Sequence, residues 1–285
     1  MRPHPTLEIM RRRGFAEAAA RIADVSRPGV RLRTTGRTVT SPVASQIGGV
    51  PSIPAGEPWP AREGAPLSFL AQVQLGDLQG LPGCEVLPSN GLLQFWSEPT
   101  QRVWGFDPAD RGAWFVRHVP GSAVASLVNQ QVPKNDDAHP LTFPASGVEM
   151  QVRLTLPPWE SKLFESLGLT DDEKAAFSDA EDETENEVGV EHQLLGHPRQ
   201  IQGDMSLDCQ LVSNGLYCGD ATGYQAPERP SLEPGALDWR LLLQLDSDEI
   251  TKMMWGDAGR RYFWMRRADL EARAFERAWM ILQCY

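Results

Sequence analysis

The feature that most constrains the fold of this chain is an echo between two distant parts of it. The sequences PLSFLAQV (66–73) and GLLQFW (91–96) return as WRLLLQL (239–245) and GRRYFW (259–264). Each copy has an apolar segment that contains a glutamine, followed by a glycine four residues before a Phe-Trp pair. Because 285 residues contain only 10 Phe and 9 Trp, chance predicts fewer than one such pair. The echo therefore predicts an internally duplicated unit.

Composition indicates what that unit is built from. The chain has 25 glycines and 23 prolines spread along its length, which favours short strands and turns over long helices, and its hydrophobic content of 41% is enough for a large core. We predict a mainly β fold that borders on α+β. Its antiparallel sheets would form a roll-like arrangement of two similar halves, with a few peripheral helices.

The same patterns predict how the chain is divided. We expect an N-terminal helix and first strand in 1–44, a first β-rich half in 45–168, an acidic linker in 169–190 and a second β-rich half in 191–285, all within one compact domain. The helix is expected over 7–24, and Asp269 is expected to cap a short helix that begins at Leu270. Residues 204–234 are expected to hold an insertion. The predicted strands are Val30–Thr40, Leu67–Leu75, Gly91–Trp96, Arg102–Phe106, Trp114–Val119, Val148–Leu156, Arg240–Leu245, Arg260–Met265 and Trp279–Tyr285.

Most of the negative charge lies in one segment. The formal net charge is −11, and nine acids with one lysine supply −8 of it between residues 171 and 187. Thr170 can cap a helix there, because the acids of a first turn complement the helix dipole. We expect a solvated helix end or linker, with two alternatives: a docking strip for a basic partner, or an intramolecular contact with the arginines of 260–277.

The chain offers no recognised signature of a nucleic-acid or membrane protein. Clustered lysines and arginines that would contact phosphates are missing, so no nucleic-acid partner is expected. No apolar stretch approaches the roughly 20 residues that a membrane helix needs. Arginines stand at 11–13, where a signal peptide would have its apolar core, so we expect a cytoplasmic protein.

Signatures of catalysis and of cofactors are also missing. There is no Gly-x-Ser-x-Gly elbow and no glycine-rich phosphate loop. The four widely spaced cysteines are expected to be free thiols. His192 and His197 are five residues apart, but Gly196 and Pro198 disfavour the helix on which such a pair would share a metal. We therefore predict no catalytic residues, no cofactor and no metal.

Polar and aromatic residues near the echoing segments are the candidate ligand-binding residues. Gln244, Asp246 and Asp248 alternate along a strand, so their side chains are expected on one face, and the loop with Trp255 and Asp257 follows directly. Carboxylates on one face can bind a hard cation or share a proton, although Asp residues in such loops more often bond their own turns. The echo adds Gln72, and the proline-rich loop adds Trp59, which completes the set Trp59, Gln72, Gln244, Asp246, Asp248, Trp255 and Asp257.

In order and content, several short motifs resemble the YwqG-like family, a bacterial domain of unknown function. The resemblance spans about residues 45 to 285 and implies a β-rich, roll-like fold with few helices, but no activity or cofactor. The motifs are IGGVP (47–51), WP (59–60), FLAQV (69–73), GLLQF (91–95), LQLDSD (243–248), WGDAG (255–259) and YFW (262–264).

A duplicated unit without catalytic motifs favours a non-enzymatic binding or interaction module. Its ligand would be a small molecule or a peptide, held in a groove between the Trp59 loop and residues 246–259. Two alternatives remain open: a hydrolase that uses Asp246, Asp248 and Asp257, and a protein that neutralises a basic partner surface with its acidic segment.

Overall fold

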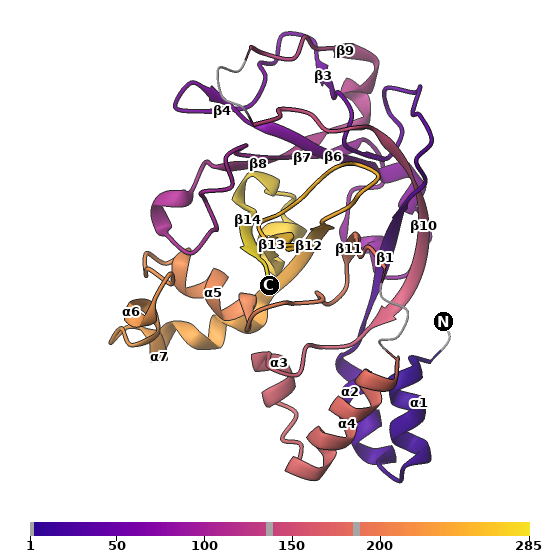
Figure 1. Cartoon of the computed structure of the whole chain (residues 1–285), viewed down its shortest axis with the longest axis vertical. Coiled ribbons are helices and arrows are strands. Elements are labelled where there is room, and N and C mark those ends of the chain that lie inside the picture. Colours follow the sequence, from indigo (N-terminus) through magenta and orange to yellow (C-terminus); the bar gives the residue numbers. More distant parts are fainter. Residues whose placement is uncertain (1–2, 135–138, 185–188) are drawn as a thin grey trace.

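The computed structural model describes residues 3–134, 139–184 and 189–285, and its centre is one strongly curved antiparallel sheet of ten strands (Figure 1). Across the sheet, the strands follow the order β14-β13-β12-β11-β1-β10-β2-β6-β7-β8. Their bounds are β1 Arg27–Thr34, β2 Gln46–Ile47, β6 Ser68–Gln74, β7 Leu92–Ser97, β8 Trp114–Val119, β10 Ser146–Thr155, β11 Gln193–Leu195, β12 Trp239–Asp246, β13 Arg260–Arg266 and β14 Trp279–Gln283. The prediction of a mainly β, antiparallel fold is confirmed.

Two small two-stranded sheets and two groups of helices surround the main sheet (Figure 1). The small sheets pair β3 (Ser52–Pro54) with β9 (Leu127–Asn129) and β4 (Ala61–Arg62) with β5 (Ala65–Pro66). One helical group contains α1 Pro5–Arg12, α2 Ala16–Val25, α3 Lys162–Glu165 and α4 Asp171–Thr184. The other group contains α5 Met205–Val212, α6 Ala221–Tyr224 and α7 Arg229–Leu232, and α8 Arg267–Glu271 follows β13. The expected insertion at 204–234 is therefore helical.

The strand order reads the same from both ends of the sheet. Three long strands and one short strand lead inwards on each side, and β1 and β10 pair with each other at the centre. We count β1, β2, β6, β7 and β8 as one set of five strands and β10–β14 as the other set. The short strand β2 pairs with β10 of the other set, and the short strand β11 likewise pairs with β1. Each set thus lends its first strand to the other.

The two ends also match in detail. The ladder between β6 and β7 shifts register at Leu70, and the ladder between β12 and β13 shifts at Leu242, which is the corresponding place in the echoing motif. Phe95 and Phe263, which follow those shifts, contact each other across the interior with ring centroids 5.2 Å apart. Leu70 and Leu242 are both fully buried strand residues. The predicted origin in a duplicated unit stays a prediction, which these matches support.

The sheet is not closed into a barrel. Its edge strands β8 and β14 approach each other through side chains: Trp114 lies against Trp279, with ring centroids 4.9 Å apart, and donates from its indole nitrogen to the Ala278 carbonyl. Large apolar side chains fill the interior, because the residues of both ends alternate inwards. The roll-like arrangement remains a prediction.

Three local predictions are wrong. The helix expected over 7–24 is two helices, because Gly14 has φ +93° and breaks it. Arg102–Phe106 is a loop rather than a strand, since Gly105 has φ +86° and lies so close to the Met280 carbonyl that no side chain would fit. Helix α8 begins at Arg267 instead of Leu270, and Asp269 lies inside its first turn, where it binds Arg277.

The first strand was also predicted too far along the chain. It covers Arg27–Thr34 instead of Val30–Thr40. The strand stops there because Gly36 has φ +68°. The amides of Thr35 and Gly36 donate hydrogen bonds to the Ser146 hydroxyl.

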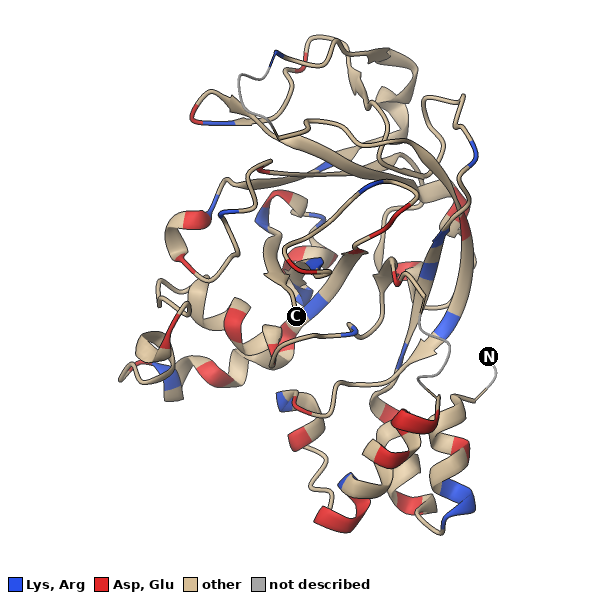
Figure 2. Ribbon diagram, viewed as in Figure 1, with Lys and Arg blue, Asp and Glu red and all other residues tan. Residues whose placement is uncertain are grey.

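The acidic segment is a packed helix over its described part. Thr170 and Glu173 form the expected reciprocal cap, and Phe177 is fully buried against the N-terminal helices. Two of its ion pairs join Glu173 to Arg21 of α2 and Glu183 to Arg13, which lies between α1 and α2. The contact with the arginines of 260–277 stays a prediction. Glu185 and Glu187 of the segment lie outside the described residues. Figure 2 shows the concentration of acidic residues on this helical group.

Candidate functional site

A cavity of about 300 Å³ lies where α1 and α4 meet the centre of the sheet. Polar and charged side chains dominate its lining, which we call the arginine cavity. The polar and charged side chains of the lining include His4, Arg31, Arg153, Glu191, Gln193, His197 and Arg199. They come from four separate parts of the chain: the start of α1, the outer face of β1, the outer face of β10 and the segment around β11.

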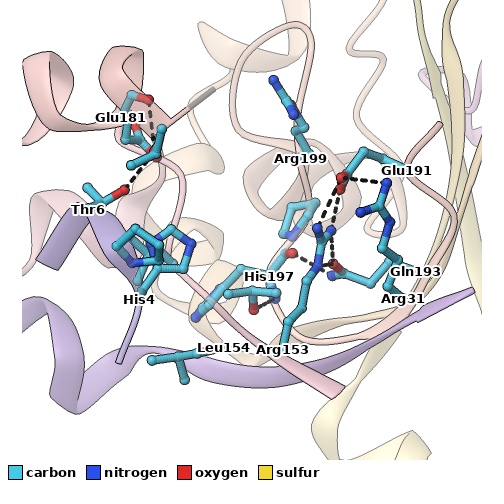
Figure 3. Close-up of a pocket in the computed structure, with 15 residues that line it drawn as sticks. His4, Thr6, Arg31, Arg153, Leu154, Glu181, Glu191, Gln193, His197 and Arg199 are labelled. Carbon is cyan, nitrogen blue, oxygen red and sulfur yellow. Dashed lines mark hydrogen bonds and ion pairs between the residues drawn. The ribbon is translucent and has the colours of Figure 1, made fainter. Parts of the chain in front are cut away.

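Glu191 and Arg153 form the centre of this cavity. Arg153 binds the buried carboxylate with two parallel hydrogen bonds, one from Nη1 to Oε1 at 3.0 Å and one from Nη2 to Oε2. The same guanidinium binds Gln193 Oε1, with Nη2 at 2.7 Å. Figure 3 shows Arg31 and Arg153 both next to the Glu191 carboxylate, and the Nη2 of Arg31 lies 3.8 Å from Oε1. This fork geometry holds the charges in fixed positions.

The electrostatic field in the cavity is positive. Burial raises the pKa of Glu191, but Arg153, Arg31 and Arg199 outweigh that effect and hold the pKa below its ordinary value. Burial and the charge of Arg153 lower the pKa of His4 to about 4, so its imidazole is neutral at pH 7. The cavity therefore presents three guanidinium groups, two glutamates (Glu181 and Glu191) and two histidines (His4 and His197).

Two buried polar atoms of the lining have no hydrogen-bond partner among the described residues. They are Nδ1 of His4 and Nε of Arg31. The Nη2 of Arg31 donates a hydrogen bond to the Val190 carbonyl at 3.2 Å. Because an unsatisfied buried donor is destabilising, these atoms indicate a place where a ligand with acceptor oxygens would gain bonds.

Two residues of the predicted ligand-binding set, Gln244 and Asp246, hold the backbone of the cavity lining in place. Gln244 donates to the Glu191 carbonyl at 2.6 Å and accepts from the Arg199 amide at 2.9 Å. Asp246 accepts from the Glu191 amide at 2.8 Å and pairs with Arg260 at 3.0 Å. These two side chains, which the alternation pattern selected, fix the backbone that carries Glu191 and Arg199 and do not line the cavity.

The other members of the predicted set lie elsewhere. Asp248 is buried and bonds to His192, Thr251 and the Ile250 amide. Burial raises its pKa, but these bonds outweigh burial and bring the pKa to about 2. Trp255 is buried, with the guanidinium of Arg261 4.3 Å from its ring, and its indole donates to the Asp246 carbonyl. Asp257 is exposed in the following loop.

Trp59 and Gln72 belong to the first half of the sheet. Trp59 lies on Trp96, with ring centroids 5.0 Å apart, and donates to the Leu67 carbonyl. Gln72 donates to the carbonyls of Pro42 and Ala44. The predicted groove between the Trp59 loop and residues 246–259 stays a prediction.

Sequence reasoning missed the arginines of the lining. Arg31 was recognised only as part of a half-exposed strand, and Arg153 stood within another predicted strand. Nothing in the sequence shows that β1 and β10 are neighbours, so their arginines cannot be brought together before the sheet topology is known. Among the described residues, no group of three or more His, Cys, Asp or Glu side chains is arranged to hold a metal ion. All four cysteines are free and buried, as predicted.

Comparison with known proteins agrees with this picture of a domain without an assigned activity. A family model described as a domain of unknown function (DUF1963) matches residues 45–284, which is most of the chain and includes nine of the ten strands. The chain belongs to this family. The specific likeness to the YwqG-like members remains a prediction. A search among curated proteins found no match.

The family match divides the lining of the cavity. Arg153, Glu191, Gln193, His197 and Arg199 lie inside the matched range, whereas His4 and Arg31 precede it. No described helix is long and apolar enough to cross a membrane.

Proposed function

We propose that this protein is a non-enzymatic binding module whose ligand is a small anion held in the arginine cavity. The observation that carries the proposal is the unpartnered Nε of Arg31, a buried cationic donor that lines an open cavity next to two further arginines. An anion such as a carboxylate or phosphate matches the planar fork of a guanidinium and would receive charge-assisted hydrogen bonds there. The volume of about 300 Å³ suits a small ligand.

Several features support binding rather than catalysis. The only carboxylate at the centre, Glu191, is held by Arg153 with its pKa below the ordinary range, so it is a poor general acid or base near pH 7. The buried aspartates of the hydrolase alternative, Asp246 and Asp248, are engaged by internal partners, which weakens that alternative. The proposal also covers the chain as a whole. We propose that it is a cytoplasmic, YwqG-like protein whose roll-like fold arose by duplication of one unit.

The test is a titration of the purified protein with inorganic phosphate, succinate and citrate, followed by calorimetry. We expect at least one of these anions to bind, and Arg31→Met to weaken binding by at least ~10-fold, because a charged hydrogen bond contributes about 1.5–3 kcal/mol. The matched control is Arg33→Met, which removes an exposed arginine two residues along the same strand face. Absence of binding, or equal affinities of the two variants, contradicts the proposal.

A further inference from the structure

A second cavity of about 200 Å³ lies where β1 begins and β11 ends, and it shares no lining residue with the arginine cavity. Its walls are mainly apolar, and three arginines stand among them. The lining residues are Arg27, Pro28, Gly83, Val86, Leu195, Gly196, Arg240, Leu241, Arg267, Leu270 and Glu271. We call it the amphipathic cavity.

Two unusual backbone features form its walls. Gly83 has φ +84° and approaches Pro28 so closely that a Cβ would lie 2.6 Å from the proline ring, which brings the Cys84–Val86 turn over the opening of β1. Leu195 has φ +57°, a conformation that costs a residue with a side chain about 1 kcal/mol or more. At the corresponding place in the first half the chain has Gly48. The strained leucine contributes an apolar surface that glycine would not provide.

The arginines of this cavity are poorly compensated. Among the described residues, the half-buried Arg27 guanidinium makes no hydrogen bond and no ion pair, while Arg240 donates to the Leu237 and Trp239 carbonyls. Arg267 pairs with Asp238 at 3.2 Å, and Glu271 is exposed at the rim. Burial and the charges of Arg240 and Arg267 lower the pKa of Arg27 to about 10, so burial and the neighbouring cations both disfavour its charged form.

We propose that the amphipathic cavity binds a small carboxylate with a short apolar chain, whose carboxylate pairs with Arg27 and whose chain lies on Leu195, Leu241 and Leu270. Charge complementarity selects the head group, because a carboxylate relieves the repulsion between three guanidinium groups. The apolar walls select the tail. The volume lies below the range of drug-sized pockets, so the ligand is short. This site is independent of the anion site in the arginine cavity.

The test uses hexanoate as the probe, with acetate and hexanol as controls for its head and its tail. We expect hexanoate to bind the full chain at least ~10-fold more tightly than either control, because both parts of the cavity must be filled. Hexanol binding as tightly as hexanoate, or no detectable hexanoate binding, overturns the proposal.

Variants identify the site. Arg27→Met is expected to weaken hexanoate binding by at least ~10-fold, and Arg33→Met to leave it unchanged. The melting temperature of ligand-free Arg27→Met is expected to equal or exceed that of the parent protein, because the substitution removes a charge that its surroundings disfavour. Unchanged hexanoate affinity in Arg27→Met overturns the proposal.

A second pair of variants keeps the test decisive if Arg27→Met does not fold. Val86→Asp places a negative charge at the mouth of the cavity on a side chain that is 45% exposed, and Val50→Asp places the same charge on a residue 48% exposed outside it. Only Val86→Asp should weaken hexanoate binding. Phosphate binding in the arginine cavity should be unchanged in Val86→Asp, because Val86 does not line that cavity, so failure of one site is distinguishable from failure of the other.

Discussion

The two ends of the sheet have the same construction but different chemistry at one position. At the end of the sheet formed by β11–β14, Arg31 of β1 pairs with Gln193, and the Glu191 carbonyl accepts from Gln244. At the end formed by β2 and β6–β8, Gly147 of β10 pairs with Gln46, and the Ala44 carbonyl accepts from Gln72. The glutamines are shared, so they belong to the construction of the fold.

The arginine cluster occurs on one side only. Where the β11 end has Arg31 and Glu191, the β2 end has Gly147 and Ala44, and the cavity there is lined mainly by small residues, with Asp77 as a charged exception. A sheet of this kind can therefore be built without the charged group. Because burying charges is unfavourable unless they are well paired, a charged cluster that the fold does not require supports the anion site that we propose.

The largest test of the comparison concerns the two phenylalanines that meet across the interior. Phe95→Ala and Phe263→Ala should each lower the free energy of unfolding by about 3–5 kcal/mol, because each removes a fully buried ring. Since the rings contact each other, the double variant should lose less than the sum of the two single losses. Urea unfolding measures all three. Markedly unequal single losses would break the equivalence of the two ends.

A second test concerns the turn after each short strand. Gly48→Ala should lower the free energy of unfolding by about 3 kcal/mol, because φ is +70° and a Cβ would lie 2.3 Å from the Pro144 carbonyl oxygen. The matched control Gly112→Ala also has positive φ but open space around it, so it should lose only about 1 kcal/mol. Equal losses would show that the close approach is unimportant. Leu195 tolerates a side chain at the corresponding place, which makes the two turns unequal.

A third test uses pH. Burial and the charge of Arg27 lower the pKa of His197 from 6.5 to about 3, while Val50 at the corresponding place cannot titrate. Between these values the unfolded chain holds a proton that the folded chain does not, so stability from this group is complete above pH 6.5 and falls as the pH decreases.

The slope should approach about 1.4 kcal/mol per pH unit. His197→Val should remove that slope and add a constant loss of about 1 kcal/mol, because the ring also bonds the Val25 carbonyl at 2.8 Å. Denaturation at several pH values between 7 and 4 measures both effects. Parallel stability curves of the two proteins would contradict the prediction.

The smallest expected effect sharpens the comparison most. Gly147→Arg inserts a side chain at the place that corresponds to Arg31, and a Cβ there meets its nearest neighbour at an ordinary 3.5 Å. We expect thermal unfolding to show a change within about 0.5 kcal/mol. A large loss would mean that the first half excludes an arginine for structural reasons, and the one-sided distribution of charge would then say nothing about ligands.

Local patterns predicted the fold well where each strand carries its own signal. The strands β6, β7, β8, β12 and β13 lie within about two residues of their predicted bounds, because alternation and turn residues delimit them. The break at Gly14 and the loop at Gly105 were missed, since both depend on a left-handed glycine whose conformation the sequence does not reveal.

The candidate site was only half predictable. Gln244 and Asp246 were selected correctly as neighbours by their spacing of two, and they turn out to support Glu191. Arg31 and Arg153 are more than a hundred residues apart and meet only because β1 pairs with β10. Long-range pairing of this kind leaves no trace in a single sequence.

The exchange of first strands between the two sets also dictates when the sheet can assemble. The two neighbours of Arg27–Thr34 in the sheet, β10 and β11, are synthesised more than a hundred residues after it. Such distant pairing slows folding and leaves an unpaired strand exposed in the growing chain. A nascent chain that stops before Leu195 cannot complete the centre of the sheet, so β1 stays without its two neighbours until that point.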